Sequence, residues 1–190
     1  MSAPRRSVLA MAVLSMLTEE PMHAYRMQQL IKERHKGDVV NVTQRNSIYQ
    51  TIDRLLRDEL MVVESMARAA NRPERTTYRI TDAGRVILRE WLNAMLSTPA
   101  REYPEFPAAL SFLPTLSPRE AIGALTARIS NLEQQMAALD EELARGRTFL
   151  PRLFLIESEY QRQVLAAELD HVRGLVDDLR AKRITWPSTP

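Results

Sequence analysis

The stretch that decides the fold reads TQRNSIYQTIDRLLRDELMVVESMARAANRPERTTYRITDAG, from Thr43 to Gly84. Up to about Asp58 its isoleucines and leucines stand three and four residues apart, which predicts a helix with one apolar face. Two short segments with alternating character follow, and they predict a β-hairpin with a basic loop. Thr81 then predicts the N-cap of another helix. The order of helix, hairpin and helix is the layout of a winged helix-turn-helix.

The predicted helix and the hairpin loop both carry side chains that suit nucleic acid. Asparagine, glutamine and arginine pair with base edges in the major groove, and arginines on a loop reach phosphates or a narrow minor groove. A polar face is equally typical of a helix that is merely solvated. The basic loop favours the other interpretation, in which the partner is double-stranded DNA. The predicted DNA-binding residues are Thr43, Gln44, Arg45, Asn46, Ser47, Tyr49, Gln50, Arg54, Arg68, Asn71, Arg72 and Arg75.

Composition restricts the classes of protein that fit. Among 190 residues there are 5 glycines and 6% aromatic residues, which favours helices over a large sheet. The absence of cysteine excludes disulfides and thiolate metal sites and fits a cytoplasmic location. Residues 1–97 hold 15 Lys+Arg against 11 Asp+Glu, whereas residues 98–190 hold 11 against 13. This asymmetry places a nucleic-acid contact in the front half.

An apolar run near the N-terminus resembles a signal peptide. Glu19 and Glu20 stand where a cleavage site needs small residues, and the run is too short to cross a bilayer. We therefore predict a buried first helix from Ser7 to about Thr18, and no membrane partner. A second helix, with Pro21 in its first turn, and a short strand or extended link over residues 39–42 complete the front half.

A run of prolines separates the back half from the front. Residues 98–117 contain four prolines and predict a connector with a short packed helix. Ser117, Pro118 and Glu120 predict the capped start of a long helix, and a final helix follows it. The predicted domains are residues 1–97, a connector over residues 98–117, and a long-helix dimerisation domain over residues 118–183. The fold class is mainly α with a small β-wing.

Heptad spacing runs through both predicted helices of the last domain. Apolar residues recur at alternating steps of three and four, a pattern that demands a helical partner. The two helices can pair within one chain as an antiparallel hairpin, or between chains. Burial of both seams and their flanks is easier in a dimer, so we favour a homodimer. The predicted dimerisation residues are Ile122, Leu125, Ile129, Leu132, Met136, Leu139, Leu143, Leu165, Leu169, Val172, Val176 and Leu179.

The sequence contains no pattern typical of a catalytic or metal site. His23, His35 and His171 are not at ligand spacing from one another, and no cysteine supplements them. Gly84 is isolated, so no glycine-rich phosphate loop is present. We therefore predict no catalytic residue, no metal and no cofactor, and a protein that is not an enzyme.

Several short motifs resemble the PadR family of bacterial transcriptional regulators. In the front half they are Pro21-Met22-His23-Ala24-Tyr25, Ser47-Ile48-Tyr49, Asp58-Glu59-Leu60 and Tyr78-Arg79-Ile80-Thr81-Asp82-Ala83-Gly84, in the family's order over residues 9–88. Glu105-Phe106-Pro107 and Glu159-Tyr160 resemble the C-terminal helical domain of the family's longer, virulence-activator-type subgroup.

Three positions depart from the family pattern. Ala24 and Glu59 replace glycines, and Gln50 replaces a proline. Glycine at position 59 would let the helix end in a left-handed turn, so we expect this helix exit to differ, either frayed or extended by a residue. Gln50 adds a hydrogen-bond donor and acceptor to the DNA face.

The resemblance implies a homodimeric, sequence-specific repressor that binds an inverted-repeat operator and is released by a small aromatic effector. The aromatic residues that could line an effector pocket are Trp91, Phe106, Phe112, Phe149, Phe154 and Tyr160. For each of them, packing between helices is the competing interpretation. An alternative from a different class is a protein-interaction adaptor that keeps the winged helix and the long helices as a scaffold.

Overall fold

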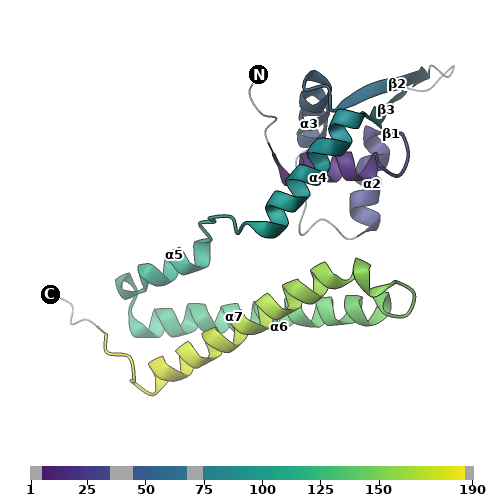
Figure 1. Ribbon diagram of the computed structural model, residues 1–190. Helices are drawn as coiled ribbons and strands as arrows, with labels where there is room; N and C mark the ends of the chain where they lie inside the picture. The colour runs from purple at the N-terminus through teal and green to yellow at the C-terminus, as the bar shows by residue number, and fades with distance from the viewer. Residues whose placement is uncertain (1–5, 35–44, 68–74, 187–190) are drawn as a thin grey trace. The chain divides into compact units, whose positions relative to one another are not determined.

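The computed structural model describes residues 6–34, 45–67 and 75–186. The chain divides into two compact units, Met1–Arg101 and Glu102–Pro190, each with a hydrophobic core of its own. The fold is mainly helical with one small antiparallel sheet, as the sequence predicts (Figure 1). Within the described ranges, no helix is both long and apolar enough to cross a membrane.

The first unit is built around α1 (Val8–Met16), α2 (Ala24–Glu33), α3 (Arg45–Arg57) and α4 (Asp82–Ser97). α1 begins at its predicted cap, where the Ser7 hydroxyl oxygen accepts from the Ala10 N–H at 3.1 Å. Ala10, Val13 and Leu14 are fully buried, and α1 packs against both α3 and α4. Contact with two helices explains why α1 is apolar on more than one side.

A three-stranded sheet completes this unit, with the antiparallel order β1 (Met22–His23), β3 (Arg75–Ile80), β2 (Met61–Ala67). β2 and β3 are the predicted hairpin. β1 corrects the prediction that Pro21 lies in the first turn of the second helix, because Met22 and His23 pair with β3 and α2 starts only at Ala24. The His23 Nδ1 accepts from the Arg26 N–H at 3.0 Å and so caps α2. The predicted link over residues 39–42 lies outside the described residues.

The second unit holds α5 (Glu105–Ser111), the short 3-10 helix η2 (Leu113–Thr115), α6 (Pro118–Gly146), η3 (Arg152–Phe154) and α7 (Ile156–Arg180). α6 starts at a capping box, in which the Ser117 oxygen accepts from the Glu120 N–H and the Glu120 carboxylate accepts from the Ser117 N–H. α6 and α7 lie side by side as an antiparallel hairpin (Figure 1).

The heptad seams of α6 and α7 meet inside this hairpin. Leu125, Leu132, Leu169, Val172, Val176 and Leu179 are buried members of one cluster, and Ile122, Ile129, Met136 and Leu165 pack against it half-buried. Leu143 is also buried, and Leu139 is half-buried. Of the two pairings that the sequence leaves open, the one within a single chain is therefore present.

Ion pairs also link α6 to α7 beside the buried seam. Arg173 Nη2 lies 2.6 Å from Glu133 Oε1, and Arg162 pairs with Asp140 nearer the turn. Arg128 pairs with Glu168 and also lies over the ring of Phe106, 3.6 Å from its centroid. This one guanidinium therefore joins α5, α6 and α7.

Candidate nucleic-acid interface

α3 presents one buried and one exposed face. Ile48, Ile52 and Leu55 are at most 1% exposed and belong to the core of the first unit. On the opposite side, Tyr49 is 51% exposed and Gln50 is exposed beside it. Burial of three large apolar side chains fixes the rotation of the helix about its own axis. The polar face is therefore held toward solvent.

Two of the predicted DNA-binding residues on α3 have partners within the protein. Arg54 is half-buried, and its Nη2 donates to the Ser7 hydroxyl at 3.0 Å, at the N-cap of α1. Ser47 is half-buried, and its carbonyl accepts from the Thr51 hydroxyl at 2.8 Å. Among the described side chains of this helix, Tyr49 and Gln50 are the exposed members of the predicted set.

The other predicted residues are not placed. Thr43, Gln44, Arg68, Asn71 and Arg72 lie outside the described residues, and so do the side chains of Arg45, Asn46 and Arg75.

Arg57 extends the exposed face and is absent from the predicted set. It is exposed, it ends α3, and it forms no ion pair within the described ranges. Arg57 follows Asp53 by four residues, so the spacing alone places both side chains on the same polar face of the helix. An arginine at the end of α3 is suited to a phosphate contact.

Acidic and aromatic groups neighbour this face. Burial raises the pKa of the Tyr78 phenol on β3, and the negative charge of Asp53 on α3 raises it further. A phenol is already neutral at neutral pH, because its ordinary pKa is about 10, and both effects favour the same form. Asp53 is exposed, and a carboxylate there disfavours a phosphate beside the middle of the helix.

α3 ends in a left-handed turn, which corrects the expectation that Glu59 frays or extends the exit. Glu59 has a φ of 58°. The Leu60 N–H donates to the Leu55 carbonyl at 2.9 Å, and the Glu59 N–H donates to the Leu56 carbonyl at 3.1 Å. These two bonds are the Schellman motif, which here forms around a glutamate in place of a glycine.

The exit of α3 lies directly against the start of α4. Thr81 caps α4 by accepting from the Gly84 N–H at 3.0 Å, as predicted, and its own N–H donates to the Leu60 carbonyl at 3.1 Å. A Cβ atom on Gly84 would lie 2.0 Å from the Leu60 oxygen. The contact therefore requires glycine, and it fixes the end of α3 against α4.

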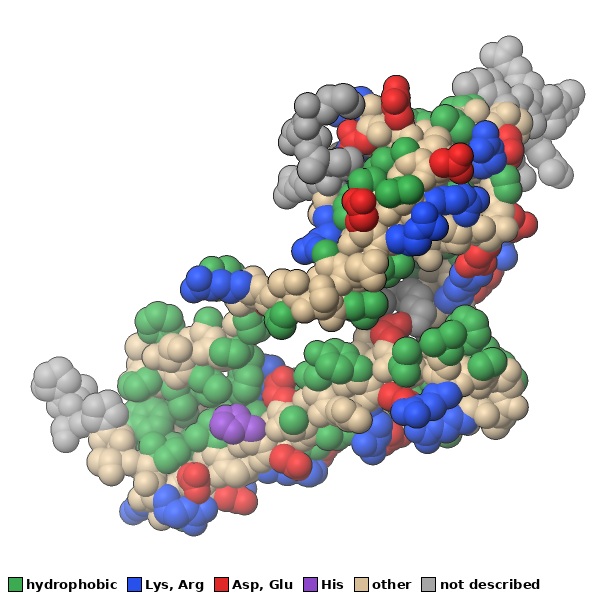
Figure 2. All heavy atoms as spheres, viewed as in Figure 1, with side chains coloured by type: hydrophobic (Ala, Val, Ile, Leu, Met, Phe, Trp, Pro, Cys, Tyr) green, Lys and Arg blue, Asp and Glu red, His purple; other side chains and the backbone are tan. Residues whose placement is uncertain are grey.

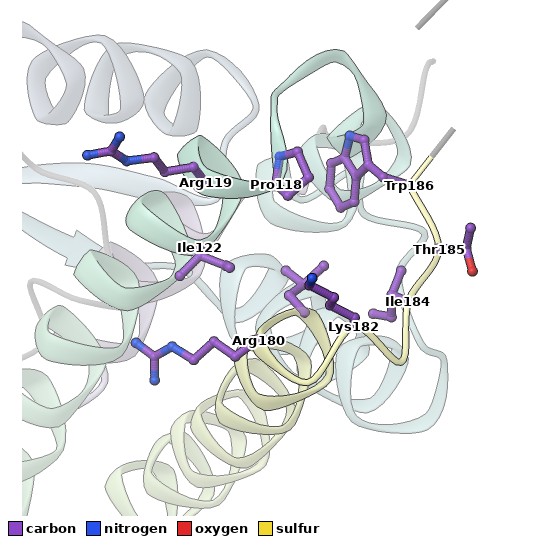
Figure 3. Close-up of a pocket in the computed structure, with 9 residues that line it drawn as sticks. Pro118, Arg119, Ile122, Arg180, Lys182, Ile184, Thr185 and Trp186 are labelled. Atoms are coloured by element: carbon purple, nitrogen blue, oxygen red, sulfur yellow. The ribbon is translucent and has the colours of Figure 1, made fainter. Parts of the chain in front are cut away.

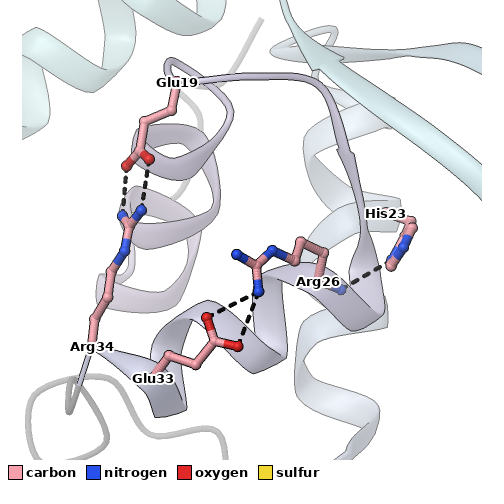
Figure 4. A network of polar contacts seen from close by, with 5 residues as sticks. All are labelled: Glu19, His23, Arg26, Glu33 and Arg34. Atoms are coloured by element: carbon pink, nitrogen blue, oxygen red, sulfur yellow. Dashed lines mark hydrogen bonds and ion pairs between the residues drawn. The ribbon is translucent and has the colours of Figure 1, made fainter.

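Two arginines of the helix-turn-helix are neutralised within it (Figure 4). Arg34 donates to both carboxylate oxygens of Glu19 at 2.6 and 2.7 Å, and Arg26 donates to both oxygens of Glu33 at 3.0 and 2.9 Å. The hydrogen bond from Arg34 lowers the pKa of the Glu19 carboxyl. The Arg34–Glu19 pair links the end of α2 to the segment after α1, whereas the Arg26–Glu33 pair lies within α2. Both pairs contribute little net positive charge to the surface.

The described residues thus define a winged-helix protein that carries a C-terminal hairpin of long helices. Residues 13–90 match the model of the family described as "Transcriptional regulator PadR-like family". The match covers most of the winged-helix unit, which is therefore similar to the PadR-like family.

Solved structures of similar fold extend over nearly the whole chain. A structure of Bacillus subtilis PadR in complex with operator DNA has a TM-score of 0.75 at 17% identity and covers 92% of this chain and 99% of its own. The same protein in complex with p-coumaric acid has a TM-score of 0.70 at 16% identity, covering 95% and 98%. The Vibrio cholerae virulence activator AphA has a TM-score of 0.67 at 17% identity, covering 92% and 99%. No curated protein matches the sequence.

Proposed function

We propose that the protein is a homodimeric, sequence-specific DNA-binding repressor that places α3 in the major groove. The observation that carries this proposal is the exposed face with Tyr49, Gln50 and Arg57 on a helix whose other face is buried and whose exit is pinned to α4. The wing arginines Arg68, Arg72 and Arg75 would contact the flanking backbone or minor groove.

The similarity to PadR supports this mode of action. One of the similar structures contains operator DNA, and it shares the fold of this chain over 92% of the residues. A dimer with two-fold symmetry would bind an inverted repeat whose half-sites lie about one helical turn, or a multiple of it, apart. A regulator of genes acts where the DNA is, so we expect it in the cytoplasm.

Exposed apolar residues on the second unit support the homodimer. Because many seam residues are already buried within the hairpin, the dimer needs further apolar surface. Ile156, Tyr160 and Val164 recur every fourth residue on α7 and are 50%, 67% and 47% exposed. Phe149, Leu153 and Phe154 at the turn of the hairpin are also exposed. Figure 2 shows apolar side chains gathered near this end of the hairpin.

A second chain would bury this surface. An apolar strip that continues from the turn along α7 is larger than isolated surface residues and is typical of a protein interface. The half-buried seam residues Ile129, Met136, Leu139 and Leu165 would extend the interface between the chains. We therefore assign dimerisation to α6 and α7.

Relief of repression by a small aromatic molecule is the last part of the proposal. One of the similar structures is a complex with p-coumaric acid, and this supports an effector of that class. Of the aromatic candidates, Trp91 is buried in the core of the first unit, and Phe106 lies under Arg128. Phe112, Phe149, Phe154 and Tyr160 are 60–72% exposed.

Selection of bound sequences from a pool of random duplex DNA tests the proposed function. Enrichment of an inverted repeat, bound with an affinity that falls steeply as salt rises, is the expected result. Failure to enrich any sequence, together with a stable complex with another protein, would instead favour the adaptor.

A further inference from the structure

A cavity of about 670 Å³ lies in the second unit, where the start of α6 meets the end of α7 (Figure 3). Its walls are mostly apolar. The lining residues are Pro118, Arg119, Ile122, Leu179, Arg180, Lys182, Ile184, Thr185 and Trp186. Pockets that bind small molecules have volumes of about 300–1,000 Å³ and are apolar with a few placed polar groups. The cavity therefore has the size and the lining of a ligand site.

The charged groups of the lining all have one sign. Arg119, Arg180 and Lys182 are cations, and none of the described residues that line the cavity is acidic. Within the described ranges, none of the three forms an ion pair. The neighbouring Arg183, which does not line the cavity, is paired with Asp178 at 2.6 Å. Cations that have no carboxylate partner, next to an apolar surface, favour the binding of an anion that has an apolar body.

Trp186 forms a fixed wall of the cavity. Its Nε1 donates to the Leu116 carbonyl at 2.9 Å, across 70 positions of sequence. The indole is half-buried and packs against the core of the second unit. Its polar group is therefore satisfied away from the cavity, so the ring offers an apolar surface to a ligand.

Lys182 is placed in the cavity at a conformational cost. Its φ is 55°, and it stands at the end of α7 in a Schellman motif formed by hydrogen bonds from Lys182 to Leu179 and from Arg183 to Asp178. Glycine is the residue that this position favours. Figure 3 shows the lysine side chain reaching from the end of α7 toward the middle of the lining, between Ile122 and Ile184, whereas the Arg119 and Arg180 side chains extend away from Trp186. A lysine here weakens the turn but brings an ammonium group to the apolar floor.

We propose that this cavity binds a small amphipathic organic anion, with an apolar and preferably aromatic body against Ile122 and Trp186 and an acid group at Lys182. Arg119 and Arg180 would add long-range attraction for the same charge. The site lies wholly within the second unit, and the proposal does not depend on DNA binding.

Binding of 8-anilinonaphthalene-1-sulfonate to the full chain tests the proposal, with the uncharged N-phenyl-1-naphthylamine as the matched probe. We expect saturable binding of the sulfonate with energy transfer from tryptophan, and binding of the neutral dye at least about tenfold weaker. Trp186→Phe should lower the transfer, because Trp186 itself lines the cavity.

Three variants at two adjacent positions separate the site from general charge effects. Lys182→Met should weaken sulfonate binding about tenfold, whereas Arg183→Met, which removes the same charge one residue away, should change it less than about twofold. Lys182→Gly should weaken binding as much as Lys182→Met and yet raise the melting temperature. Equal binding by the wild type and both position-182 variants would overturn the proposal, and so would equal affinity for the two dyes.

Discussion

The Thr81 hydroxyl donates to the main-chain carbonyl of Glu59 at 2.8 Å, and the same oxygen accepts from the Gly84 N–H at 3.0 Å. One threonine thus caps α4 and binds the turn in which α3 ends. The left-handed Glu59 delivers its carbonyl to this threonine, so the turn and the cap depend on each other. The relationship fixes the direction in which the exposed face of α3 points.

Glu59→Gly should stabilise the first unit. Glycine adopts a positive φ without the steric cost that a side chain carries, and we expect a gain of about 0.5–1 kcal/mol in the free energy of unfolding. Chemical denaturation of the full chain measures it. Glu59→Ala serves as the control, because it removes the carboxylate and keeps the Cβ; an equal gain there would show that charge, and not the backbone, limits stability.

Gly84→Ala should destabilise the protein by about 3 kcal/mol, because the added Cβ meets the Leu60 carbonyl oxygen and backbone has no room to move. Gly123 on α6 provides the matched control, since nothing lies within 4 Å of a Cβ built there. Gly123→Ala should raise stability by about 0.5–1 kcal/mol. Thermal melts of both variants decide the matter, and similar melting temperatures for the two would contradict the close contact.

His23→Ala should cost about 1 kcal/mol, because the variant loses the side-chain acceptor that caps α2 at the Arg26 N–H. His23→Asn keeps a good capping group and should retain most of the wild-type stability. Urea titration distinguishes the two variants. If alanine and asparagine were equally destabilising, the imidazole would act through packing against Tyr25 instead of through the cap.

The pair of Glu19 and Arg34 should make stability depend on pH in the acid range. The pKa of the folded-state carboxyl is lowered, first by the hydrogen bond from Arg34, so its contribution is present above the unfolded pKa of about 4.3 and is lost as the pH falls through the folded value. The difference in melting temperature between the wild type and Arg34→Met should therefore shrink as the pH falls from about 7 to about 3. In a Glu19→Gln background, Arg34→Met should show a much smaller dependence, because Glu33 is then the remaining carboxylate that interacts with Arg34.

The sequence is sufficient to predict those elements that depend on residues close together in the chain. The caps at Ser7, Thr81 and Ser117 and the helical spacing of α3, α6 and α7 all appear in the fold, because each depends on residues within one or two turns. β1 could not be predicted in this way. Met22 and His23 form a strand only because Tyr78 and Thr77, more than fifty positions later, lie opposite them.

The partners of side chains in the candidate site were harder to predict than the helices and caps, because they lie far away in the sequence. Arg54 has the spacing of a DNA-binding residue, but its guanidinium bonds to Ser7, 47 positions earlier in the chain. The left-handed Glu59 was equally hidden, since propensity favours glycine and the contact with Thr81 that holds the turn is long-range. The helical spacing places Arg57 on the polar side of α3, where the structure shows it exposed, although it is not among the predicted DNA-binding residues.

The central claim, that the exposed face of α3 reads DNA sequence, is tested most directly by the double variant Asn46→Ala, Gln50→Ala. The measurement is the ratio of affinities for the selected inverted repeat and for random duplex DNA, at fixed salt. We predict that the ratio falls by about tenfold or more, as loss of base contacts requires, while affinity for random DNA and the melting temperature stay unchanged. Gln134→Ala, an exposed glutamine on α6, is the control and should leave the ratio intact. A double variant that still discriminates as well as the wild type would contradict the assignment of α3 as the reading helix.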